Sequence, residues 1–557
     1  MMKISESDCI LLLDTENKEI NEDKELERDD DKDFDGGSDD EQNCDFCNNA
    51  IDDLNCDSFN NADDEPHSSD PSWPRSYRKS MDLLGTVASP SLSFLGSPRG
   101  SFLLSSPKQR QNSKITTGLG NPLLPPLADN HHHPQRHTSN HSLHSQWTSS
   151  TKKLSQSLHQ KPQIGQSSFS QAVVNGVNLL CGVALLSTPY AVKEGGWIGL
   201  SIMFIFCALC FYTGLLLRDC LDTNPRLQTY PDIGEAAFGI PGRLLVSIVL
   251  YVELYASCVE FIILESDNIS TLFPNAHVII GRNQLNSHSF FAILITFIIL
   301  PTVWLRDMSV LSYISAGGVF VTIILVVSLF WIGLVDNIGF QMETTKMLNL
   351  STLPVSIGMY GYCYAGHAVL PNIYMSMEKR SQYPLVLFAS FAICTIIYAG
   401  VAIMGYMMFG ESIESQFTLN LPPKLLASKI ALWATVISPL TKYALTISPV
   451  AKSLEELIPL KHSKSHVYSI LIRTALVIST LIVALTVPFF GLVMSLIGSL
   501  LSMLVSLIFP CACFLRILRG NVTRFQVSLC VLIIATGFIS LSFGTYTAIS
   551  EIIQQYL

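Results

Sequence analysis

Residues 166–557 contain repeated apolar stretches of about 17–25 residues, the length needed to cross a lipid bilayer. Lipid offers no partners to backbone polar groups, so only helices or closed barrels cross it. The stretches are continuously apolar and do not alternate, which favours helices over barrel strands. The sequence therefore predicts an all-α integral membrane protein with about eleven transmembrane helices. These cover residues 168–192, 196–220, 242–266, 289–305, 309–335, 354–377, 384–409, 425–448, 466–487, 490–515 and 526–550.

The composition divides the chain into two parts. With 48% apolar and only 14% charged residues in 557, the whole is too apolar for a soluble protein of this size. The net charge of −10 belongs mainly to residues 1–165, which are acidic and rich in Ser and Pro. Such a composition does not form a core, so we expect a disordered cytoplasmic tail over 1–165 and a transmembrane domain over 166–557. An acidic chain also argues against nucleic-acid binding.

The tail contains one sorting motif. Asp8 followed by Leu12 and Leu13 fits the acidic dileucine pattern that sorting adaptors read, which would direct the protein to a vacuole or lysosome. The alternative is a chance match in an acidic tail that contains leucines.

No enzymatic or metal-binding motif is found in the sequence. Most of the fourteen cysteines stand singly in apolar runs, as small apolar residues do. Cys44 and Cys47 form a CxxC pair without a second pair or a His at zinc spacing, so we expect no metal and no cofactor. A phosphate-binding loop and a nucleophile elbow are also missing, which argues against an enzyme.

Basic residues between the stretches predict the orientation. One set of connections is rich in them: Arg218, Arg226, Arg243, Arg306, Lys379, Arg380, Lys452, Lys461, Lys464, Arg516, Arg519 and Arg524. The alternate set carries fewer: Lys193, Arg282, Lys346 and Lys424. The positive-inside rule places the richer set and the amino terminus in the cytoplasm, and the carboxyl terminus on the lumenal side.

The first and sixth stretches carry Gly and Asn at their centres, where a simple membrane anchor would carry Leu. The segments are 175–190 and 358–367. Glycine weakens a helix by ~1 kcal/mol, and unwound backbone within a membrane is tolerated where it lines a polar cavity. Helices five apart are expected to match in two inverted five-helix repeats, whose half-helix termini bind a charged substrate. Alternatively, these glycines are close-packing positions between helices.

Five segments together resemble a known family. The first and sixth stretches read NLLCGVALLSTPYAVKEGGW and YGYCYAGHAVLPNIYMSM, and the others are TYPDIGEAAFG, VELYASCVEFIILESDNISTLFP and SPLTKYALTISPVAKSLEE. They resemble the amino acid/auxin permease superfamily, specifically its plant and fungal vacuolar amino-acid transporter branch. The resemblance covers essentially all of residues 166–557, and the acidic tail fits it.

The resemblance implies an inverted-repeat (LeuT-like) transporter with an eleventh helix that moves neutral amino acids coupled to protons. It places the substrate between the first and sixth helices. The substrate-binding residues that it implies are Asn178, Leu180, Gly182, Val183, Tyr360, Gly361, Tyr362, Tyr364 and His367.

The eighth stretch departs from sodium-coupled members of that fold. Those relatives supply a hydroxyl near the ion, and here Thr441 is followed directly by Lys442. A buried ammonium group would repel sodium and stand in for it. Alternatively, Lys442 extends to the cytoplasmic headgroups.

Carboxyl groups in the third stretch are candidates for proton coupling. Glu253 and Glu260 are seven residues apart and share a helix face, and burial favours the protonated form of such groups. Glu260 is our first choice, His367 is the next, and a structural hydrogen bond from a protonated Glu is the alternative. Glu265, near the lumenal end, is expected to be solvated.

The function predicted from these observations is secondary active transport of neutral amino acids across the vacuolar (tonoplast) membrane, by proton antiport into the vacuole. Two alternatives stay open. One is proton-coupled export from the vacuole, and the other is a nutrient sensor with little net flux.

Overall fold

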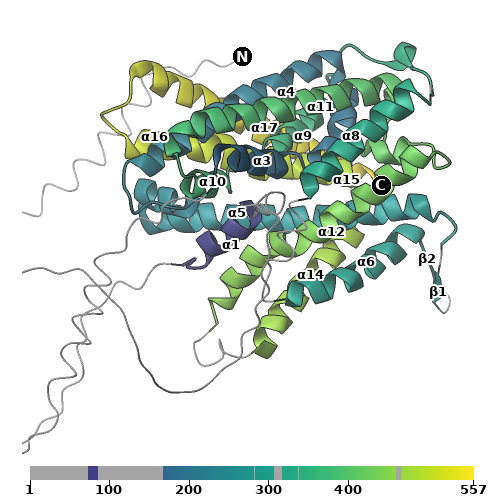
Figure 1. The fold of residues 1–557 in the computed structure, drawn as a ribbon, viewed down its shortest axis with the longest axis horizontal. Coiled ribbons are helices and arrows are strands. Elements are labelled where there is room, and N and C mark those ends of the chain that lie inside the picture. Colours follow the sequence, from purple (N-terminus) through teal and green to yellow (C-terminus); the bar gives the residue numbers. More distant parts are fainter. Residues whose placement is uncertain are drawn as a thin grey trace, which may run out of the picture. The chain divides into compact units, whose positions relative to one another are not determined.

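The computed structural model describes residues 73–85, 167–276, 278–280, 283–305, 317–336, 338–458 and 466–557. In these ranges the regular structure is helical apart from one short antiparallel hairpin (Figure 1). The α-helices are α1 (Tyr77–Gly85), α3 (Phe169–Leu180), α4 (Ala184–Asp222), α5 (Tyr230–Leu272), α6 (Ser287–Trp304), α8 (Gly318–Leu334), α9 (Leu353–Cys363), α10 (Leu370–Ser376), α11 (Tyr383–Phe409), α12 (Leu426–Glu455), α14 (His466–Thr486), α15 (Phe490–Leu496), α16 (Phe509–Ile517) and α17 (Arg524–Gln554).

The remaining elements are short. Four are 3-10 helices: η2 (Met342–Thr344), η3 (Arg380–Gln382), η4 (Gly410–Ser412) and η5 (Phe417–Asn420). Two π-helices, η6 (Ile497–Ser502) and η7 (Leu504–Ile508), join α15 to α16. In the hairpin, β1 (Val278–Ile280) pairs with β2 (Asn283–Leu285), with Ile279 opposite Gln284.

Helices lie on all eleven predicted stretches, which confirms the all-helical membrane fold. In the described part of the chain, eight helical segments are long and apolar enough to cross a membrane by themselves. The other stretches are covered by the 17-residue α8, by the pair α9 and α10, and by α3 with the first part of α4. Helix α4 continues past a kink at Gly196, where φ is +72°, into the second stretch. That the chain crosses the membrane eleven times remains a prediction.

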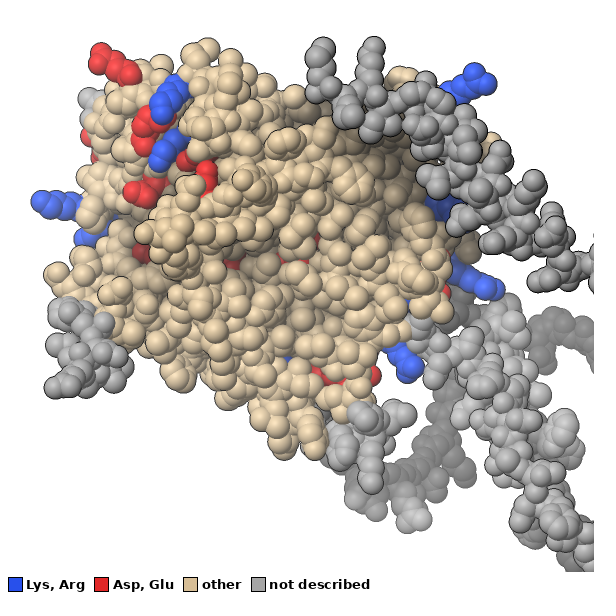
Figure 2. Space-filling model, turned by 180° about the vertical axis from the view of Figure 1, so that it is seen from behind, with Lys and Arg blue, Asp and Glu red and all other residues tan. Residues whose placement is uncertain are grey.

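The outer surface of the described helices is apolar, as a lipid-facing surface must be. Large side chains such as Phe320, Ile396 and Phe525 are mostly exposed. In Figure 2 the surface is tan over a wide central area, and the charged residues lie mainly toward its left and right sides. Inside, α4 packs against α9 and α11, and α12 packs against α5 and α8.

Both predicted helix interruptions are present. Helix α3 ends at Leu180 and α4 starts at Ala184, while α9 ends at Cys363 and α10 starts at Leu370. The two breaks lie in the first and sixth stretches, five apart, which is the arrangement expected of inverted repeats. At each break the ladder of helical hydrogen bonds stops within a predicted membrane stretch.

Part of the predicted disordered tail has a defined structure. Residues 73–85 include helix α1, whose Tyr77 and Met81 are almost fully buried against other helices. For these residues the expectation of disorder does not hold. The sorting motif at Asp8, Leu12 and Leu13 lies outside the described residues.

Candidate functional site

A cavity of about 150 Å³ lies next to both helix breaks. Residues from six helices and from the two breaks line it. They are Leu84, Asn178, Leu179, Leu180, Gly182, Val183, Ala184, Glu253, Leu254, Ser257, Phe261, Tyr362, Ala365, Gly366, Ala368, Val369, Lys442 and Thr446. Its size is below the ~300–1,000 Å³ of typical drug-sized sites, which indicates a small ligand.

The first break supplies backbone to this cavity. Asn178, Leu180, Gly182 and Val183, all predicted from the sequence, line it. A Cβ added to Gly182 would meet no other atom within 4 Å, so the glycine borders open space. The amino terminus of α4, which starts at Ala184, carries the partial positive charge of the helix dipole. This end of α4 is suited to an anionic group.

Residues at the second break, in the sixth stretch, also line the cavity. Tyr362 lines the cavity, whereas Tyr360, Gly361, Tyr364 and His367, which were predicted with it, are not among the lining residues. Tyr360 and Gly361 lie on other faces of α9 than Tyr362, because successive residues of a helix point in different directions. Tyr364 and His367 follow the end of α9 at Cys363 and belong to the non-helical break. Gly366, which lines the cavity, was not singled out from the sequence.

The four residues away from the cavity have other contacts. The Tyr364 hydroxyl lies 2.7 Å from Oγ1 of Thr395, and its ring stacks on Phe391. His367 Nε2 lies 2.9 Å from Oγ1 of Thr213. A Cβ on Gly361 would collide with Met503, so this glycine is a packing position. The contact with Met503 favours the packing alternative at Gly361, whereas Gly182 borders the cavity.

Of the three glutamates in the third predicted stretch, Glu253 lies at the cavity. Its Oε1 accepts a hydrogen bond of 2.9 Å from the Ser502 hydroxyl. Glu260, the first choice from the sequence, is fully buried and is not among the residues that line the cavity. Glu265 was expected to be solvated, and this is wrong because its side chain is fully buried.

Lys442 and Asn178 converge on α8. The Lys442 side chain lines the cavity, so it does not extend to the headgroups. A Cβ on Gly318, the first residue of α8, would collide with Oδ1 of Asn178 and lie 3.4 Å from Nζ of Lys442. Thr441 points elsewhere, since its hydroxyl donates to the Ser438 carbonyl at 2.8 Å. The backbone of α8 thus closes the cavity behind Asn178 and Lys442.

Gly318→Ala is expected to raise the KM for transport about tenfold, because the new methyl group displaces Asn178 or Lys442. Initial uptake rates over a range of substrate concentrations measure this. Gly199→Ala is the control, since its Cβ would meet only Oγ of Ser356 at an ordinary 3.7 Å. Equal KM values for the two variants would contradict the placement of Gly318 at the site.

Tyr398 of α11 was missed by sequence reasoning, yet it contacts both breaks. Its buried hydroxyl donates to the Leu180 carbonyl at 2.5 Å and approaches the Cys363 carbonyl at 3.3 Å. These carbonyls belong to the last residues of α3 and α9, which lack their helical partners. One tyrosine therefore links the ends of the two half-helices.

Tyr398→Phe is expected to lower the free energy of unfolding by ~1–3 kcal/mol, because the Cys363 carbonyl loses the tyrosine hydroxyl and the Leu180 carbonyl keeps only the Gly182 amide as a donor. We also expect slower transport, since the two breaks are no longer linked. Thermal unfolding of the purified protein and initial uptake rates test both effects. Tyr546→Phe, at an exposed tyrosine of α17, is the control. If the two variants behave alike, the Tyr398 hydroxyl has no special role.

Several known proteins are similar to this chain. Residues 165–550 match the family model described as transmembrane amino acid transporter protein. Amino acid transporter AVT1C of Arabidopsis thaliana is 58% identical over 88% of this chain and 91% of its own. Amino acid transporter AVT1B of the same plant is 58% identical, over 87% of this chain and 89% of the AVT1B chain. The vesicular GABA transporter of Caenorhabditis elegans is 26% identical, over 69% of this chain and 80% of its own chain.

Proposed function

Because the chain belongs to the transmembrane amino acid transporter family, we propose that it is a proton-coupled secondary transporter of neutral amino acids in the vacuolar membrane. The direction that we propose is antiport, with amino acids entering the vacuole as protons leave. The family and its relatives are transporters and not enzymes. The membrane, the coupling ion and the direction are parts of the proposal.

One observation carries the substrate class. The described residues that line the cavity include one carboxylate, Glu253, and one ammonium group, Lys442, together with both helix breaks. An amino acid is a zwitterion and needs a partner of each sign. We propose that Lys442 and the amino terminus of α4 bind its carboxylate, and that Glu253 and the carbonyls that end α3 bind its ammonium group.

The rest of the cavity wall favours a neutral side chain. Leu179, Val183, Leu254, Phe261 and Val369 are apolar, and burying a charged substrate side chain among them would be costly. A substrate with a second charge would also compete with Glu253 or Lys442. Small neutral amino acids are therefore the proposed substrates.

Glu253 is the proposed proton carrier. It lies at the cavity with Ser502 beside it, so it can exchange a proton with whichever side the cavity opens to. Glu260 is not among the residues that line the cavity, so it has no such direct access. This proposal replaces our first choice from the sequence with the neighbouring carboxylate on the same helix face.

Uptake by purified protein in lipid vesicles tests the substrate class. A panel of labelled neutral, acidic and basic amino acids is offered to vesicles with an acidic interior. We expect neutral members to accumulate and charged ones to remain at the level of protein-free vesicles. Preferred uptake of a charged amino acid would overturn the assignment.

A further inference from the structure

Helix α1 of residues 73–85 packs against α12, α10 and α3, and we call the surface that this segment covers the groove. The groove lies at the end of the bundle that the basic residues predict to be cytoplasmic. Tyr77, Ser80 and Met81 of α1 face the bundle and are almost fully buried, whereas Lys79 is exposed. This spacing of three and four residues defines one buried helix face. The segment is thus docked mainly through the side chains of Tyr77 and Met81, and Ser80 is buried beside them.

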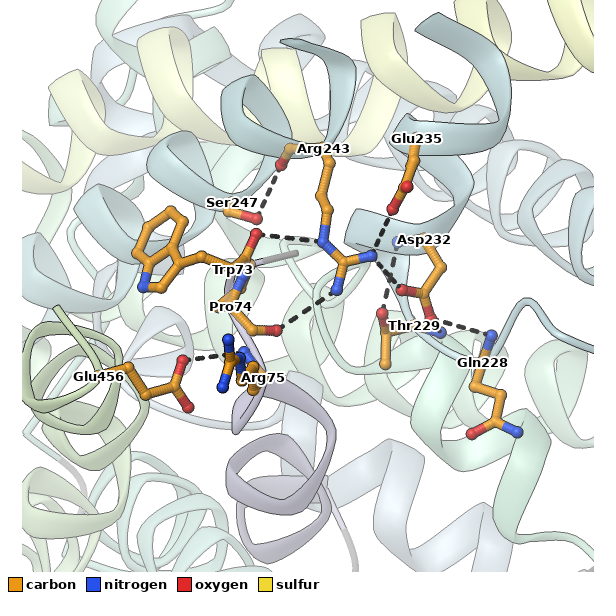
Figure 3. A network of polar contacts seen from close by, with 10 residues as sticks. All are labelled: Trp73, Pro74, Arg75, Gln228, Thr229, Asp232, Glu235, Arg243, Ser247 and Glu456. Atoms are coloured by element: carbon orange, nitrogen blue, oxygen red, sulfur yellow. Dashed lines mark hydrogen bonds and ion pairs between the residues drawn. The ribbon is translucent and has the colours of Figure 1, made fainter. Parts of the chain in front are cut away.

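The beginning of the segment is held by two charged side chains (Figure 3). The amides of Arg75 and Ser76 donate to the Glu456 carboxylate at 2.8 and 2.6 Å, which places a negative charge at the start of α1. The Arg243 guanidinium donates to the carbonyls of Trp73 and Pro74 at 3.1 and 3.4 Å.

Arg243 is itself fixed by ion pairs with Asp232 at 2.8 Å and Glu235 at 2.6 Å, both in α5 (Figure 3). Trp73 adds a hydrogen bond of 2.9 Å from its indole nitrogen to the Ser453 carbonyl of α12. The rings of Trp73 and Tyr77 also lie against Tyr251 of α5. The beginning of the segment is therefore bound to α5 and α12.

The other contacts reach the second helix break. The Tyr77 hydroxyl donates to the carbonyl of Ala368, which lies between α9 and α10, at 3.2 Å. Asn372 of α10 donates to Asp82 at 2.8 Å and to the Arg78 carbonyl at 3.3 Å. Leu84, near the end of α1, lines the candidate cavity. The segment thus joins the broken sixth stretch to α5 and α12 and forms part of the cavity wall.

We propose that residues 73–85 form a plug that closes the cavity at this end and leaves its groove when the cavity opens there. The proposal rests on the proposed function, because the plug would interrupt the substrate path. While docked, it holds α10 against α5 and α12 and places Leu84 at the cavity. The groove is accordingly a binding site for a segment of this same chain.

The test measures access to the cavity. Thr446, a lining residue, is changed to cysteine, and its reaction with a membrane-impermeant thiol reagent is followed in sealed vesicles of each orientation. The parent protein and the double variant Trp73→Ala/Tyr77→Ala are compared. We expect labelling about tenfold faster in the double variant, from the predicted cytoplasmic side only.

Two controls separate plug release from general damage. Lys79→Ala lies on the exposed face of α1 and is expected to label like the parent. A variant lacking residues 73–85 should label as fast as the double variant, and a synthetic peptide of residues 70–88 should restore slow labelling. The same peptide with Tyr77→Ala should not. Size-exclusion profiles confirm that each variant is folded.

Unchanged labelling after deletion, or faster labelling in Lys79→Ala as well, would overturn the plug. The labelling assay needs no transport, so it is independent of the proposed substrate. If the parent protein moved no amino acid while labelling still responded to the plug variants, the transport proposal would fail and the plug would stand.

Discussion

Gly182→Leu is expected to abolish amino acid uptake while the protein still folds and reaches the membrane. The Cβ direction at Gly182 opens onto the cavity with no atom within 4 Å, so a leucine side chain would occupy the substrate space without displacing other side chains. Uptake into vesicles should fall to the level of protein-free vesicles. Gly182→Ala, with one carbon, should show a partial loss.

The matched control is Gly400→Ala in α11, whose Cβ would meet Phe330 at an ordinary contact distance of 3.5 Å. This variant should transport at the normal rate. Near-normal uptake by Gly182→Leu would show that the substrate does not pass this cavity, and the proposed site would have to be abandoned.

Glu253→Gln is expected to lose accumulation driven by a pH gradient and to keep exchange of labelled for unlabelled amino acid only at higher substrate concentrations, because the amide no longer pairs with the substrate's ammonium group. Glutamine resembles the permanently protonated acid, so it keeps the shape of the side chain and the proximity to Ser502. The variant should equilibrate substrate without concentrating it. Parallel measurements of net uptake and of exchange in the same vesicles separate the two activities.

Glu260→Gln is the comparison, because this residue lies on the same face of α5 but away from the cavity. It should retain gradient-driven accumulation, with a reduced rate at most. If Glu260→Gln loses accumulation driven by the pH gradient and Glu253→Gln does not, then Glu260, the residue chosen first from the sequence, is the proton carrier.

The two helix breaks were predictable because glycine and asparagine at the centre of an apolar stretch conflict with a simple membrane helix. The residues at the first break that line the cavity, namely Asn178, Leu180, Gly182 and Val183, were those that the family resemblance implied. In the sixth stretch the sequence suggested too many residues, since Tyr360, Tyr362, Tyr364 and His367 are all polar aromatic groups. Only the rotation of α9, which packs against α4 and α17, selects Tyr362.

Other contacts had no local signal. Tyr398 looks like any aromatic residue in an apolar helix, and its role arises because α11 passes both breaks. The docked segment 73–85 has mixed composition, so averages over the tail conceal the spacing of Tyr77, Met81 and Leu84. Lys442 was recognised by its charge, but its direction is set by α8 and Gly318.

The most direct test of the whole account is accumulation of a labelled neutral amino acid in vesicles that contain only this protein, with and without an imposed pH gradient. We predict accumulation above the external concentration when the interior is acidic. It should collapse when a proton carrier dissipates the gradient, and replacing sodium by potassium should not affect it. Accumulation that needs sodium, or that persists without the pH gradient, would contradict the proposed proton coupling.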